Sequence, residues 1–210
     1  CYPPLADHFL TMNNLDHIRR ILKFSKATDN SYKGRQFEVG YQTLHIDGVE
    51  IKGQAEPVHW LQKLGFDFSG KSILDIGSNQ GGMLFPLATT ISSGMGIDLN
   101  PNLVNAANKI ARHSGYGNLD FYVFDLENDP LSLLNDFAAP ACFDIVFFLN
   151  LCMKIKNWKE VLGWIHMNSD ACLFETIGKP RNQMRQEEEA RRLFPTVELI
   201  KEQPLSDNTR

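Results

Sequence analysis

The chain has 210 residues, of which 43% are hydrophobic, and a formal net charge of −4 at pH 7. This length allows one sizeable core, and the absence of any run of 18 apolar residues argues against a membrane-spanning helix. The four cysteines have neither metal-site spacing nor the pattern of a small disulfide framework, and the negative charge gives no global reason to bind nucleic acid. We therefore expect a reduced, cytoplasmic setting.

The N-terminal residues predict a helix followed by a hairpin. Over residues 5–24, apolar side chains recur on one helical stripe and basic ones lie elsewhere. We interpret this helix as packed on the domain, with a binding helix as the alternative, and residues 25–40 as a loop. The next segment, YQTLHIDGVEIKG, alternates on either side of Asp47-Gly48. That dipeptide favours a hairpin, because both central residues of a type I′ turn need positive φ.

From residue 55 onward, helical and strand patterns alternate. Helices are predicted at 55–64, 81–91, 100–114, 130–137, 156–166 and 181–193, and strands at 72–76, 94–99, 119–124, 143–149, 171–176 and 196–202. Strands that are apolar throughout and separated by helices are typical of a parallel sheet covered on both faces. The pattern predicts an α/β fold with a doubly wound, mostly parallel sheet.

The loop after the first of these strands is the first candidate for a ligand site, because such sheets bind ligands at the carboxyl ends of their strands. It runs Gly77-Ser78-Asn79-Gln80-Gly81-Gly82. A dinucleotide fingerprint would have a second glycine at the position of Asn79, where backbone approaches a pyrophosphate. A Walker loop would need Gly-Lys-Ser/Thr, and we expect none in this chain. Both phosphate-binding interpretations are weakened.

Two carboxylates follow the next two strands. Asp98 ends the second strand, where an acidic side chain can accept hydrogen bonds from ribose hydroxyls, and Asp125 follows the third. Glycine backbone and carboxylates without a phosphate-binding lysine suit a ligand that has a ribose, an adenine and a positive charge but no phosphate. S-adenosylmethionine fits this description.

The motifs LDIGSNQGG, GIDLNP, FDLEN and FDIVFFLN, taken in order over roughly residues 70–178, resemble the successive motifs of class I S-adenosylmethionine-dependent methyltransferases. The resemblance implies a Rossmann-like methyltransferase fold, with S-adenosylhomocysteine as the product. The upstream segment HIDGVEIKGQ is similar to that of a subset that includes tRNA-modifying methyltransferases, in which a hairpin ending in Gly-Gln precedes the core. We accordingly divide the chain into an N-terminal extension, 1–54, expected to cover cofactor and substrate, and a methyltransferase core, 55–210.

The resemblance implies a role for each matched residue. Asp75 and Gly77 would line the methionine portion of the cofactor, and Asp98 would bind the ribose hydroxyls. Asp125 would accept from the adenine amine, and Asn150 would border both methionine and acceptor. The other implied cofactor-binding residues are Ser78, Asn79 and Gly81 in the glycine loop, Leu99 and Leu126 around the adenine, and Gln54, a hypothetical cap from the hairpin.

The family usually adds a seventh, antiparallel strand beside the fifth, whereas this sequence ends shortly after residue 202. We expect the final strand to be truncated here, which would leave the fifth strand at an edge. A fused domain outside these 210 residues is also an expectation.

Methyl transfer from a sulfonium depends mainly on positioning, so no catalytic dyad is required. The loop after the fourth strand, NLCMKIKN, lacks the Asn/Asp-Pro-Pro-Tyr/Phe of exocyclic-amine methylases and the Pro-Cys of cytosine-type enzymes, and Cys152 is interpreted as a buried thiol. No metal site is expected. We predict transfer to an O or N atom of a small molecule, with RNA as the alternative acceptor, and Asn150 and Glu175 as the catalytic residues. A solvated strand-end carboxylate is the alternative interpretation of Glu175.

Two other functions are weighed against catalysis. A cofactor-binding but inactive regulatory partner would keep the same glycine loop and carboxylates. A nicotinamide-dependent oxidoreductase would need the glycine that Asn79 replaces.

Overall fold

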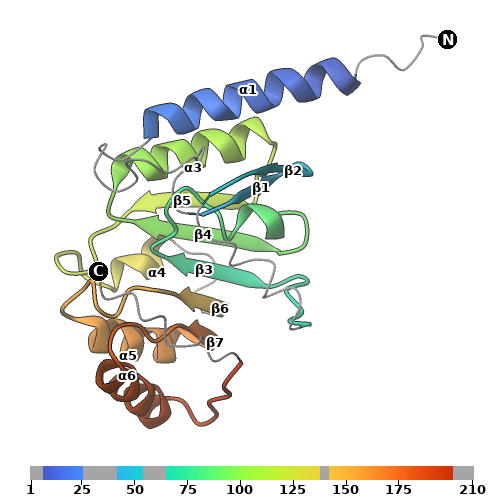
Figure 1. The fold of residues 1–210 in the computed structure, drawn as a ribbon. Coiled ribbons are helices and arrows are strands. Elements are labelled where there is room, and N and C mark those ends of the chain that lie inside the picture. The colour runs from blue at the N-terminus through green and yellow to red at the C-terminus, as the bar shows by residue number, and fades with distance from the viewer. Residues whose placement is uncertain (1–6, 26–41, 54–64, 138–141, 201–210) are drawn as a thin grey trace.

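The computed structural model describes residues 7–25, 42–53, 65–137 and 142–200. Five parallel strands form its main sheet: β3 (Ser72–Ile76), β4 (Ser93–Asp98), β5 (Leu119–Val123), β6 (Phe143–Phe148) and β7 (Ser169–Phe174). Their order is β5-β4-β3-β6-β7, with every pair parallel (Figure 1). The chain builds outward from β3 in one direction and then in the other, so the point where the order reverses lies between β3 and β6. The predicted doubly wound parallel sheet is confirmed.

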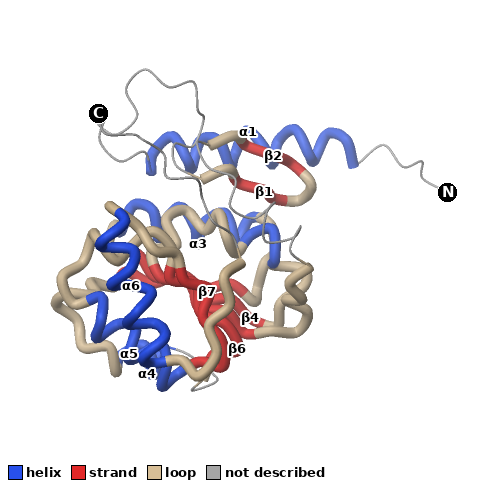
Figure 2. The backbone as a smooth tube through the Cα atoms, turned by 60° about the horizontal axis from the view of Figure 1, so that its bottom comes forward, coloured by secondary structure: helices blue, strands red, loops and turns tan. Residues whose placement is uncertain are grey.

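Helices cover both faces of this sheet (Figure 2). Alternate residues of the central strand belong to different hydrophobic clusters, Ile73 to one and Leu74 to the other. The first cluster includes α1 (Asp7–Ser25) and α3 (Pro101–His113). The second includes α4 (Leu133–Phe137), α5 (Trp158–Asn168) and α6 (Pro180–Leu193). The central strands β3 and β6 are therefore buried along nearly their whole length, because both faces are covered, whereas the edge strands β5 and β7 include exposed residues such as Asp120 and Asp170.

The predicted N-terminal helix and hairpin are confirmed, whereas the predicted loop 25–40 lies outside the described residues except for Ser25, which ends α1. Helix α1 lies along α3, where the rings of His17 and His113 are 4.4 Å apart (Figure 1). Strands β1 (Leu44–Ile46) and β2 (Val49–Ile51) form an antiparallel hairpin. Its turn residues have positive φ, 51° at Asp47 and 76° at Gly48, as a type I′ turn requires. The Tyr116 hydroxyl donates to Asp47 Oδ1 at 2.7 Å, which attaches the hairpin to the core.

Two predicted elements are wrong. Residues 81–91 form turns around a short 3₁₀ helix, η1 (Phe85–Leu87), instead of a regular helix. Pro86 explains this, since a proline inside a helix lacks the N–H of an i→i−4 bond and clashes with the preceding turn. The predicted strand 196–202 is also wrong over 196–200, which follow α6 without strand pairing. The predicted helix 55–64 lies outside the described residues.

Within the described residues no strand follows β7, so β7 is an edge strand of the main sheet there. None of the helices in the described part of the chain combines the length and apolarity needed to cross a membrane.

Candidate functional site

The loop after β3 is hydrogen-bonded to the carboxyl end of β4. The N–H groups of Gly77 and Ser78 both donate to Ile97 O, at 2.8 and 2.9 Å, and the N–H of Asn79 donates to Asp98 Oδ2 at 2.9 Å. Gly77 has φ of 79° and Asn79 has φ of 52°, both in the left-handed region that asparagine tolerates better than most residues. The predicted turn is therefore present, and Asn79 is a residue type that adopts its left-handed backbone conformation readily.

Asp98 is fixed by backbone donors on both oxygens. Oδ2 accepts from Asn79 N, and Oδ1 accepts from Asn100 N at 2.9 Å. A carboxylate offers about four lone-pair positions, so about two remain for a ligand. The half-buried Asp98 at the end of β4 can therefore accept two hydroxyl groups, as a ribose presents them.

Asp75, next to the last residue of the central strand β3, is a buried carboxyl group without a donor on one oxygen. Its side chain is 3% exposed, and Oδ2 has no hydrogen-bond partner among the described residues. Burial, and secondarily the negative charge of Asp98, raise its pKa to about 7. An ionised carboxylate here is costly unless a donor or a cation reaches it. The side chain of Ser78 is likewise buried with an unpartnered hydroxyl.

The loop after β5 is the third loop at the carboxyl ends of the strands. Asp125 accepts from Glu127 N at 2.9 Å and from Asn128 Nδ2 at 2.8 Å, and chiefly the Asn128 bond lowers its pKa. Leu126 is half-buried against the cluster under α5. Leu99 is 64% exposed, an apolar side chain left in solvent directly after Asp98. Such a side chain at a ligand edge offers a surface for a flat apolar ring.

The loop after β6 reaches back over the glycine loop. A Cβ placed on Gly77 would lie 2.9 Å from Leu151 Cδ1, so this side chain rests directly on Gly77. Asn150, one residue earlier, is half-buried and has φ of 55°. Glu175 N donates to Phe148 O at 3.1 Å, so Glu175, also half-buried, lies beside the end of β6. The structure thus brings Asn150 and Glu175 to the same edge of the sheet as Asp75 and Asp98.

Three sequence predictions concern other chemistry. Cys152 is 2% exposed and burial raises the pKa of its thiol to about 12, which confirms the interpretation as a buried thiol. Among the described residues no group of three or more His, Cys, Asp or Glu could hold a metal ion. Gln54, the hypothetical cap, lies outside the described residues.

Sequence reasoning missed a literal Walker spacing upstream of β3, Gly65-Phe-Asp-Phe-Ser-Gly-Lys71-Ser72. The structure excludes a phosphate loop there, because Ser72 begins β3 at the opposite edge of the sheet and no helix follows it. Asp144 Oδ2 accepts from the N–H and the hydroxyl of Ser72, at 2.7 Å each, and Asp144 Oδ1 is 3.3 Å from Lys71 Nζ. The lysine is thus paired with a carboxylate.

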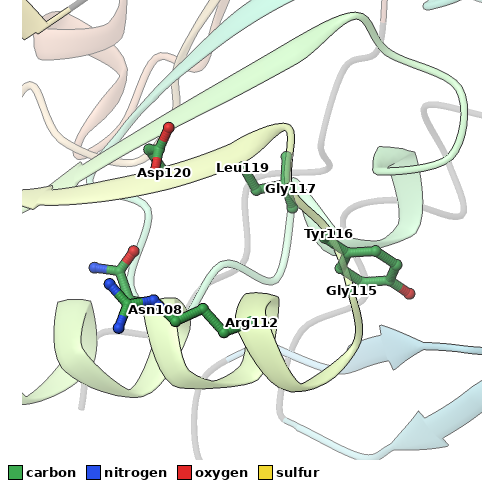
Figure 3. A pocket seen from close by; sticks show the side chains of 7 residues that line it. All are labelled: Asn108, Arg112, Gly115, Tyr116, Gly117, Leu119 and Asp120. Carbon is green, nitrogen blue, oxygen red and sulfur yellow. The ribbon is translucent and has the colours of Figure 1, made fainter.

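A cavity of about 250 Å³ lies away from this edge (Figure 3). It is lined by Asn108, Arg112, Gly115, Tyr116, Gly117, Leu119 and Asp120. Leu119 starts β5, whereas Asp98 pairs with the last residue of β5, Val123. The Asn108 side chain there donates to Phe121 O at 2.7 Å and accepts from Phe121 N at 3.2 Å. Both backbone groups of Phe121 on the edge strand β5 thus have hydrogen-bond partners.

Comparison with known proteins gives three results. Residues 67–201 match a family model described as a methyltransferase domain. The 23S rRNA (uracil(1939)-C(5))-methyltransferase RlmD of Xylella fastidiosa is 30% identical over 102 residues, covering 47% of this chain and 23% of that protein. Aklanonic acid methyltransferase DauC of Streptomyces sp. (strain C5) is 26% identical over 97 residues, covering 45% of this chain and 44% of that protein. The chain thus spans less than half the length of these curated relatives.

Solved structures show the fold. The N-terminal domain of EvdMO1, crystallised in the presence of SAH and D-fucose, is 17% identical to this chain. It superposes with a TM-score of 0.53, covering 74% of this chain and 61% of that one.

Proposed function

The chain belongs to the methyltransferase-domain family, and on that premise we propose that it transfers a methyl group from S-adenosylmethionine to an oxygen or nitrogen atom of an acceptor. The observation that carries the proposal is the pair of carboxylates around the glycine loop. Asp75 is buried with one unpartnered oxygen, and Asp98 is held at the strand end with lone pairs to spare. A cationic amine and a ribose would satisfy both.

Each side chain has a role in holding this donor. Asp75 accepts from the amine of the methionine portion, and Gly77 lines the same portion with its backbone while Leu151 packs on its Cα. Asp98 accepts from the ribose hydroxyls, while Ser78, Asn79 and Gly81 shape the turn. Leu99 and Leu126 pack on the adenine, and Asp125 accepts from its amine. Gln54 remains a proposed cap.

When bound, S-adenosylmethionine supplies a methyl group on a positively charged sulfur, ready for in-line displacement. The protein then has to hold the acceptor in line and exclude water, and such positioning lowers the barrier by up to about 7–11 kcal/mol in favourable intramolecular models. Asn150 borders the donor and the acceptor. Glu175 orients the acceptor or takes its proton, because a hydroxyl or protonated amine must lose one on methylation.

The acceptor is proposed to be a small molecule, with RNA as the alternative. The named relatives act on both kinds of substrate, a 23S rRNA uracil and aklanonic acid. Carbon methylation of a pyrimidine calls for a nucleophile that adds to the ring, and the Cys152 thiol is buried with its pKa raised to about 12. Oxygen or nitrogen acceptors therefore suit this site better.

The test has two steps. Binding of S-adenosylhomocysteine is measured by calorimetry, and release of S-adenosylhomocysteine from S-adenosylmethionine is then followed across panels of small molecules and RNA. Binding with turnover on one panel supports the proposal. Binding without turnover on any panel would favour a cofactor-binding protein without catalytic activity. No binding would refute S-adenosylmethionine as the methyl donor.

A further inference from the structure

The glycine loop lacks the support that usually follows it. In doubly wound folds the loop after the first strand opens a helix, whose first turn supplies backbone donors and fixes the loop. Here residues 81–91 form turns and a three-residue 3₁₀ helix, η1. Some other part of the molecule has to hold the carboxyl side of this loop in place.

The last turn of α1 contacts the loop at Gln80. Gln80 is 3% exposed, and its Nε2 donates to Ser25 Oγ at 2.6 Å. The Ser25 hydroxyl in turn donates to Leu22 O at 2.9 Å, and Ser25 is 2% exposed. A fully buried hydrogen-bond chain thus joins the end of α1 to a loop that lies 55 positions away in sequence.

A second contact from the N-terminal part lies beside the first. A Cβ on Gly82 would be 2.6 Å from Gln42 Oε1 and 2.8 Å from Gln42 Cβ, so the Gln42 side chain packs on the loop backbone. Helix α1 itself is held on the domain by Ile18 and Leu22, which are buried in the same cluster as α3. The described residues of α1 and Gln42 therefore pack as neighbours of the loop.

Gln80 is one residue from the group that meets Asp98. Asn79 Oδ1 accepts from Gln80 N at 2.9 Å, and Asn79 N donates to Asp98 Oδ2 at 2.9 Å. A displacement of Gln80 is thus transmitted through two hydrogen bonds to the carboxylate that holds the ribose. We propose that α1 braces the methyl-donor loop, and that Ser25 and Gln80 are positioning residues whose hydrogen bond sets donor affinity. This inference rests on the proposed function.

The test compares donor affinity with stability. Ser25→Ala and Gln80→Met are each expected to weaken S-adenosylhomocysteine binding about 5- to 20-fold, the range of moderate site-to-site coupling. The double variant should lose little more than either single one, because both remove the same bond. Ser72→Ala is the control, since it breaks a part-buried hydrogen bond that another buried serine makes, to Asp144, at the opposite end of the strands. It should lower the melting temperature and leave donor affinity unchanged.

Hydrogen exchange on the unaltered chain gives a second readout that does not depend on the variants folding. Because coupling is reciprocal, S-adenosylhomocysteine should slow amide exchange in the last turn of α1. Folded Ser25→Ala and Gln80→Met variants that bind as tightly as the wild type would overturn the brace, as would unchanged exchange in α1 or an equal affinity loss in Ser72→Ala. A wild-type chain that does not bind S-adenosylhomocysteine would overturn the proposed function instead, and the brace as a donor-site element with it.

Discussion

Replacing Asp75 by asparagine should separate folding stability from donor binding. Burial raises the pKa of Asp75 from 3.8 to about 7 in the folded protein. The folded state therefore keeps a proton that the unfolded state releases between these values, and stability falls as pH rises through that window. The free energy of unfolding falls by about 1.4 kcal/mol for each pH unit up to the folded pKa of about 7 and changes little above it. Ionisation of Asp75 can therefore remove at most about 3 kcal/mol of stability between pH 5 and pH 8.

An asparagine at this position would be nearly isosteric and would carry no charge, so the variant escapes this loss. We expect the Asp75→Asn chain to gain on the wild type by about 1–3 kcal/mol between pH 5 and pH 8, measured by urea unfolding without ligand. The same variant should bind S-adenosylhomocysteine at least about 10-fold more weakly at pH 8, because the amine loses its ionic partner. A stability difference that does not change with pH would refute the buried-carboxylate reasoning, and unchanged affinity would refute the amine assignment.

Three further predictions concern the same edge of the sheet. Asp98→Ala should weaken S-adenosylhomocysteine binding roughly 10- to 100-fold in calorimetry, since the ribose and two loop amides lose their acceptor; full retention would remove the ribose assignment. Gly77→Ala should lower the melting temperature through about 1–2 kcal/mol of left-handed strain and push on Leu151, and an unchanged melting temperature would contradict this. Glu175→Gln should reduce kcat and flatten the acid limb of the pH–rate profile, while donor affinity stays within about twofold. An unaltered kcat would refute a catalytic role for Glu175.

Local patterns predicted the sheet and most helices. Short apolar runs such as residues 145–149 are typical of buried strands. The helix predicted from residue 100 is confirmed as α3, where the Asn100 side chain accepts from Asn102 N as a cap. Asp98 was recognisable because a carboxylate at the end of a buried strand is unusual, whereas Asp75 was named only through the family resemblance. These features depend on residues that are neighbours in sequence.

What the sequence left undetermined depends on contacts between distant segments. The apolar residues at 81–91 suggested a helix, yet Pro86 prevents one, and the loop is braced by Ser25 instead. The Walker spacing ending at Lys71 is excluded by its place before β3 and by its pairing with Asp144 across the sheet. The division at residue 54 stays a prediction, although Ile18 and Leu22 of the N-terminal part share a cluster with the core.

The most direct test of the account is a thermal-shift titration of the chain with S-adenosylhomocysteine and, separately, with NAD. We predict that S-adenosylhomocysteine stabilises the fold, by about 2.7 kcal/mol at a hundred times its Kd, and that NAD does not. Stabilisation by NAD without any by S-adenosylhomocysteine would contradict the central claim that this glycine loop holds a methyl donor.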